Sequence, residues 1–83
     1  MQFLFICRSL TYAQRAARLL ERAGITGTVA RVPKNVETRG CAYCVIVMPR
    51  NKERALEVLR SAGRMPERIF LRETGGQVRE VAM

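Results

Sequence analysis

Apolar positions along this chain occur either in short continuous runs, as in buried strands, or at helical spacing. These two patterns divide the chain into short elements. Bulky apolar residues fill positions 2–7 (QFLFIC), as in a buried strand. Between Thr11 and Gly24, small and apolar residues return at helical spacing while charged residues fill the opposite face. Ser9 or Thr11 can cap the start of this helix, and Gly24 can end it in the left-handed conformation.

The same two patterns predict the elements of the rest of the chain up to residue 73. The remaining elements, in chain order, are a strand at 26–33, a polar turn at 34–40, a strand at 44–49, a helix at 51–63 and a strand at 67–73. Asn51 is the expected N-cap of the second helix. The last ten residues, 74–83, begin with a threonine and two glycines, and we expect them to be flexible or docked on the sheet.

The order strand, helix, strand, strand, helix, strand predicts one α+β domain over residues 1–73, followed by a tail at 74–83. The segments RAARLLERAG (15–24) and RALEVLRSAG (54–63) share residues at matching positions, which supports two similar halves. This order is typical of a ferredoxin-like split βαβ sandwich. In that plan a four-stranded antiparallel sheet carries two helices on one face, and the first and third strands lie side by side.

Both faces of the predicted sheet are apolar. In the first strand, Phe3 and Phe5 alternate with Leu4 and Ile6. Neither pair is polar, so neither can be assigned to a solvent-exposed face of the sheet. A large exposed apolar face is costly for a monomer, which indicates a second covering layer. The tail or another copy of the chain could supply this layer, and we favour a homodimer through the sheet face.

The chain carries fifteen Lys and Arg against seven Glu, a formal charge of +8, with no His and no Asp. This excess favours anionic partners, and Arg15, Arg18, Arg22, Arg50 and Arg54 are the candidate nucleic-acid residues. Only three Phe and two Tyr are present, so base stacking has little support. Nucleic acid is therefore the weaker reading, and a solvated basic surface the stronger one.

The chain has no apolar run of about 20 residues, the length that spans a membrane. Its opening apolar run stops at Arg8 and lacks a basic segment before it. We therefore expect a cytoplasmic protein without membrane contact, whose thiols stay reduced unless they react.

Cys41 and Cys44 form a C-x-x-C pair that can be read in three ways. They could act in redox or sulfur-transfer chemistry, in which one thiol resolves the other. They could be half of a metal site that a dimer completes, although the absence of His weakens this. They could also be structural, with Cys44 part of the core. Cys7 ends the first strand, and we expect it at the end of the sheet opposite to Cys41 and Cys44. It is interpreted as a small buried hydrophobic residue.

Three segments resemble a known family: RSLTYAQRAARLLERAGI (8–25), RVPKNV (31–36) and RGCAYCVIV (39–47). They are similar to a small bacterial family of unknown function, described as selenium/sulfur carrier protein-like domains, from about residue 3 to about residue 72. Ala42 stands where the family has glycine, and Cys44 where a small residue is more common. The resemblance therefore implies that Cys41 is the family's thiol and Cys44 an additional one.

What the resemblance implies is a carrier, without its own enzymatic activity or cofactor, that holds a persulfide or selenopersulfide on Cys41. Cys44 would release the cargo by forming a disulfide with Cys41, Arg39 would stabilise the thiolate, and Gly40 and Tyr43 would shape the loop. The implied partners are a cysteine desulfurase or another sulfur or selenium donor, and an acceptor protein. The alternatives are a basic module that binds RNA or another anion, and a protein-interaction domain with passive cysteines.

Overall fold

The structure, a computed structural model, describes all residues from 1 to 83. Its elements are β1 (Gln2–Cys7), α1 (Leu10–Arg22), β2 (Thr28–Arg31), β3 (Tyr43–Val47), a 3₁₀ turn (Pro49–Asn51), α2 (Lys52–Ser61), β4 (Arg68–Arg72) and β5 (Val78–Val81). The five strands form one antiparallel sheet in the order β2-β3-β1-β4-β5. The α+β class and the pairing of the first strand with the third are confirmed.

The predicted count of four strands is wrong, because the last ten residues contain β5. Ile69 lies opposite Val81 and Arg72 lies opposite Val78, so β5 extends the sheet beyond β4. A tight turn joins the two strands, in which the N–H of Glu73 donates to the carbonyl of Gln77 at 2.8 Å. The two glycines that suggested a loose tail make this turn, and β5 is too short and too charged to show a strand pattern.

The two helices begin differently and end alike. The Ser9 hydroxyl accepts a hydrogen bond from the N–H of Tyr12 at 3.2 Å, so the predicted cap of α1 is confirmed. Asn51 makes no capping hydrogen bond, because it belongs to the preceding 3₁₀ turn. Gly24 and Gly63 take φ angles of 79° and 67° just after the two helices, as their similar sequences suggest. No helix is long and apolar enough to cross a membrane.

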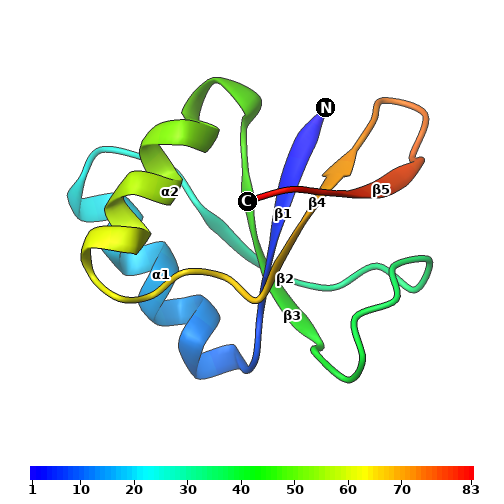
Figure 1. The fold of residues 1–83 in the computed structure, drawn as a ribbon, viewed down its shortest axis with the longest axis horizontal. Coiled ribbons are helices and arrows are strands. Elements are labelled where there is room, and N and C mark those ends of the chain that lie inside the picture. Colours follow the sequence, from blue (N-terminus) through cyan, green and yellow to red (C-terminus); the bar gives the residue numbers. More distant parts are fainter.

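The main core lies between the helices and one face of the sheet, and Figure 1 shows both helices on that side. Strand residues with odd numbers point to it, including Phe5, Val45 and Ile69, and they meet Leu20 and Leu59 from the helices. Each of these five side chains is buried. Burial of these side chains holds the two helices against one face of the sheet.

A second, smaller core occupies the opposite face of the sheet. Its buried residues are Leu4, Ile6, Val36, Cys44 and Phe70. Val36 comes from the β2–β3 loop (residues 32–42), which Figure 1 shows in green on the side away from the helices. The covering layer over this part of the sheet is therefore this loop, which the sequence pattern presents as a plain polar turn. The homodimer stays a prediction.

Candidate thiol site

The β2–β3 loop presents Cys41 at the end of a tight turn. The N–H of Cys41 donates to the carbonyl of Thr38 at 3.3 Å, and the Thr38 hydroxyl donates back to the carbonyl of Cys41. Between them, Arg39 and Gly40 both have positive φ angles, 55° and 96°. Two successive residues of this kind are typical of a type I′ turn. The buried Thr38 thus holds both ends of the turn that positions Cys41.

Two contacts attach this loop to the sheet, and a third closes its base. Val36 inserts its side chain into the second core, where it is only 8% exposed. The Arg68 guanidinium of β4 donates to the carbonyl of Glu37 at 2.7 Å. The N–H of Val32 donates to the carbonyl of Ala42 at 2.8 Å and closes the base of the loop. The loop is therefore a docked layer, and its turn has a defined place on the sheet.

The Cys41 side chain is half-buried at the edge of the second core, the most accessible of the three cysteines. The pKa of Arg68 is raised, chiefly by its hydrogen bond to Glu80, then by the charges of Glu80 and Glu37, with the smallest contribution from Cys41. The pKa of Arg8 is also raised, chiefly by its hydrogen bond to Glu67, with a smaller contribution from Cys41. Arg68 and Arg8 are therefore two cations within electrostatic range of Cys41, although their main partners are Glu80 and Glu67.

Cys44 occupies a different environment from Cys41, although both contact the second core. It lies in β3 with no exposed surface. Burial raises the pKa of the Cys44 thiol, and this outweighs the opposite effect of the Arg72 charge. Burial and a raised pKa both disfavour the thiolate, which argues against Cys44 as an attacking nucleophile.

Cys7 lies at the same end of the sheet as Cys44, so the expected separation is wrong. Because β1 and β3 are antiparallel, β1 ends where β3 begins, and Cys7 lies opposite Tyr43. The side chain of Cys7 packs on the helical face and that of Cys44 on the opposite face. Burial, followed by the charges of the other two cysteines, raises the pKa of Cys7 to about 12. Its assignment as a buried core residue is confirmed.

All three cysteines are free thiols in the structure. No group of three or more His, Cys, Asp or Glu side chains lies together as a metal site. What the arrangement offers chemically is one accessible thiol on a fixed turn with arginines nearby. Such a thiol suits nucleophilic attack on an incoming sulfur atom.

A family model described as "Putative Se/S carrier protein-like" matches residues 2–71. The chain belongs to this family. No curated protein and no solved structure matches the chain. The match spans β1 through most of β4 and so includes the β2–β3 loop and Arg68, while β5 lies outside it.

Two residues expected at the thiol have other contacts in this Se/S carrier-like family member. The Arg39 N–H donates to the carboxylate of Glu37 at 2.7 Å, and its guanidinium contributes to the lowered pKa of Glu80, after the larger effect of Arg68. Tyr43 points to the helical face, with the Arg31 guanidinium 5.2 Å from the centre of its ring. Gly40 occupies the turn as expected.

Sequence reasoning missed Arg68 and Arg8 as neighbours of Cys41. Arg68 begins β4 and Arg8 directly follows β1, so both are far from Cys41 in sequence although their charges reach it. The signal that could have revealed Arg68 is the strand order itself. A central β1 brings the start of β4 to the same end of the sheet as the start of β3.

The five arginines of the alternative nucleic-acid surface separate into two groups. Arg15, Arg18 and Arg22 line one shallow hollow on α1, together with Leu19 and Arg64. Arg50 and Arg54 do not line it, and the Arg54 guanidinium instead donates to the carbonyl of Ala23 at 2.8 Å. Arg64, from the segment between α2 and β4, was not among the candidates.

Proposed function

We propose that this protein carries sulfur or selenium as a persulfide or selenopersulfide on Cys41. The observation that carries this proposal is the contrast among the three thiols: Cys7 and Cys44 are buried with raised pKa values, and Cys41 is half-exposed on a held turn. Membership of a family described as Se/S carrier protein-like supports it.

Loading is a thiol exchange that needs no added oxidant. The Cys41 thiolate attacks the outer sulfur of a persulfide on a donor protein such as a cysteine desulfurase. A new S–S bond forms at Cys41, the S–S bond of the donor breaks, and the donor sulfur leaves as a thiolate. An outer selenium atom on the donor is transferred in the same way.

Unloading reverses this exchange toward an acceptor. A nucleophile of the acceptor attacks the outer sulfur or selenium atom, and Cys41 leaves as a thiolate. This route needs no second cysteine in the carrier. The Cys44 thiol is buried from solvent and its pKa is raised, so we assign Cys44 to packing rather than to release.

The fixed turn and the nearby arginines suit this role. A carrier thiol has to meet two partner proteins, which favours a sulfur at the surface over one in a deep pocket. Arg68 and Arg8 place positive charge near the thiolate that forms when the cargo leaves. We propose that they, rather than Arg39, supply this stabilisation.

The wider setting follows from the same reasoning. Three free thiols suit a reducing compartment such as the cytoplasm, where a persulfide carrier would meet its donor. We also infer that β1 to β4 with the two helices follow the ferredoxin-like split βαβ plan, and that β5 is an addition at the edge.

The test is loading by a cysteine desulfurase supplied with cysteine, followed by intact mass measurement under non-reducing conditions. Wild type should gain the mass of one sulfur atom, and Cys44→Ser should gain the same mass. Cys41→Ser should gain none. Equal loading of Cys41→Ser and wild type, or no loading of either Cys41-containing protein, contradicts the proposal. Circular dichroism of each variant shows that loss of loading is not loss of fold.

A further inference from the structure

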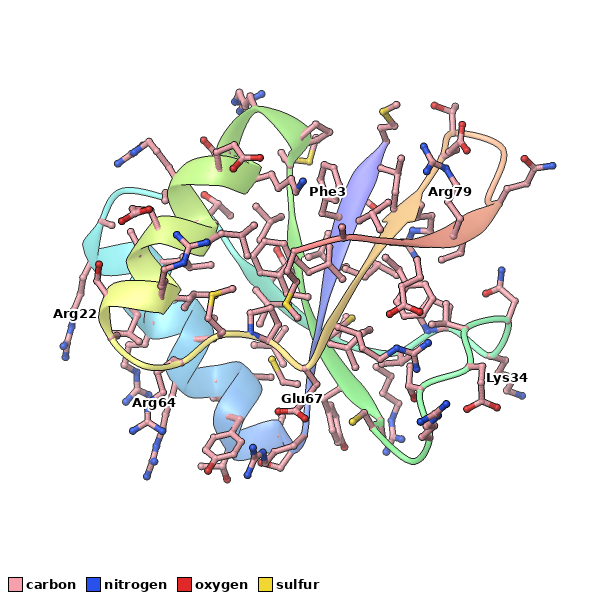
Figure 2. The ribbon with its side chains drawn as sticks, in the orientation of Figure 1. Phe3, Arg22, Lys34, Arg64, Glu67 and Arg79 are labelled. Carbon is pink, nitrogen blue, oxygen red and sulfur yellow. The ribbon has the colours of Figure 1, made fainter.

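A hollow of about 210 Å³ on the surface of α1 is lined by four arginine side chains and one leucine. Its lining consists of Arg15, Arg18, Leu19, Arg22 and Arg64. Figure 2 shows Arg22 and Arg64 projecting from the helical side of the molecule, away from Lys34 and Arg79 on the other side. Four like charges repel each other, so this arrangement disfavours the free protein and favours an anion between them.

No carboxylate neutralises these four arginines. The ion pairs of the structure join five other cations to glutamates: Arg8, Lys52, Arg60, Arg68 and Arg79. Glu21 and Arg18 both line a second hollow beside β2, but no ion pair joins them. The four guanidinium groups therefore keep their donors available for a ligand.

The arginines are spread along the helix rather than gathered at one point. Arg15, Arg18 and Arg22 lie on one side of α1, and Arg15 and Arg22 are about 10 Å apart along the axis at 1.5 Å per residue. A guanidinium can bind a phosphate through two parallel hydrogen bonds. Several phosphates in a row, rather than one, are needed to use all four groups.

The basic surface continues beyond the hollow. The guanidinium carbons of Arg64 and Arg8 both lie over the ring of Tyr12, 5.8 Å and 4.8 Å from its centre. The basic surface therefore continues from the hollow past Tyr12 as far as Arg8, which is itself paired with Glu67. Such a shape suits a chain of phosphates that lies along the surface.

The hollow is too small to enclose a nucleotide-sized ligand. Sites that bury most of a small molecule measure roughly 300–1,000 Å³, and this one has about 210 Å³. Its lining is four cations and one leucine, with no acceptor group to recognise a base or a sugar. Such a lining can bind phosphate groups but cannot distinguish one base from another.

We infer that the strip formed by Arg15, Arg18, Arg22 and Arg64 binds the sugar–phosphate backbone of a nucleic-acid strand without sequence preference. The binding is electrostatic, so it releases counterions and weakens as salt rises. This binding does not use the Cys41 thiol, so a failure of the carrier function would not affect it.

The test is fluorescence anisotropy of a short, mixed-sequence, single-stranded oligonucleotide titrated with the full chain at several salt concentrations. For four phosphate contacts, the logarithm of the affinity should fall against the logarithm of salt with a slope of about −3. In Arg22→Gln/Arg64→Gln the slope should become shallower by about 1.4, and the affinity near 0.1 M salt should fall about 25-fold.

The matched control is Lys34→Gln/Arg79→Gln, which removes the same charge from the opposite side of the molecule and should bind nearly as wild type. Equal losses in both double variants would mean that the overall charge, not the strip, binds the strand, and would overturn the inference. Absence of binding at low salt would also overturn it and favour an acidic protein as the partner. Displacement of the strand by equimolar inorganic pyrophosphate would overturn it in favour of a small phosphate ligand.

Discussion

The guanidinium of Arg68 joins the loop of Cys41 to the edge of the sheet: its Nη1 lies 2.7 Å from the carbonyl oxygen of Glu37. The same guanidinium makes a two-pronged pair with Glu80 of β5, at 3.0 Å and 2.8 Å. One side chain thus connects the β2–β3 loop, β4 and β5. The position of the thiol turn depends on this connection.

Arg68→Gln should release the β2–β3 loop. The carbonyl of Glu37 loses its charged donor and Glu80 loses its partner, so the amides of residues 32–42 should exchange faster with deuterated water. Arg60→Gln is the control, because it breaks a 2.8 Å pair with Glu57 on the surface of α2, away from the loop. Unchanged exchange in Arg68→Gln would contradict the role of Arg68 as an anchor.

Gly40→Ala should lower the free energy of unfolding by about 1–2 kcal/mol, because position 40 has a φ of 96° that disfavours any side chain. A Cβ there would meet no atom within 4 Å, so the cost comes from the backbone alone. Gly75→Ala is the matched control: it also has open space and no positive φ. Urea denaturation of the two variants compares them, and equal stabilities would contradict the turn geometry.

Val36→Ala should destabilise the protein by about 1.5 kcal/mol, because it removes two buried methyl groups from the second core. It should also speed alkylation of Cys44, since Val36 and Cys44 share that core. Chemical denaturation gives the stability, and alkylation by iodoacetamide in the native protein gives the exposure of the thiol. A variant that unfolds as wild type does would show that the loop is not a packed layer.

Stability should fall as the pH rises above 9 because of Cys7. Its folded-state pKa of about 12 lies above the ordinary value of 9.0, so the unfolded chain loses the proton first. The contribution is fully present below pH 9 and declines by at most about 1.4 kcal/mol per pH unit between pH 9 and pH 12. Urea midpoints at pH 8, 9 and 10 should therefore decline less in Cys7→Ala than in wild type. Parallel declines would contradict a buried neutral thiol.

The sequence predicts the first layer of this fold because helical spacing and apolar strands are strong local signals. Ser9, Gly24 and Gly63 mark helix ends through the short-range chemistry of their own backbone and side chains. β5 is missed because its four residues, two of them charged, become a strand only when β4 offers its edge. The role of Val36 is missed for a similar reason, since one valine in a polar segment shows no period.

The site was predictable only in part. The thiol and its turn are contiguous in sequence, so Cys41 and Gly40 could be named together. Arg68 and Arg8 could not, because their approach to Cys41 depends on strand order and on how the loop folds back over the sheet. The different states of Cys41 and Cys44 likewise follow from three-dimensional burial, which a C-x-x-C spacing does not encode.

The most direct test of the carrier role is to locate the transferred sulfur atom in the wild-type protein, with all three cysteines present. After incubation with a cysteine desulfurase and cysteine, the persulfide is trapped by alkylation and the chain is digested with trypsin. Cleavage after Arg8, Arg39 and Arg50 leaves Cys7 in one peptide and the other two cysteines in residues 40–50, where fragment masses distinguish them. The added sulfur is expected on Cys41. A persulfide on Cys44 or Cys7, with Cys41 unmodified, would contradict it.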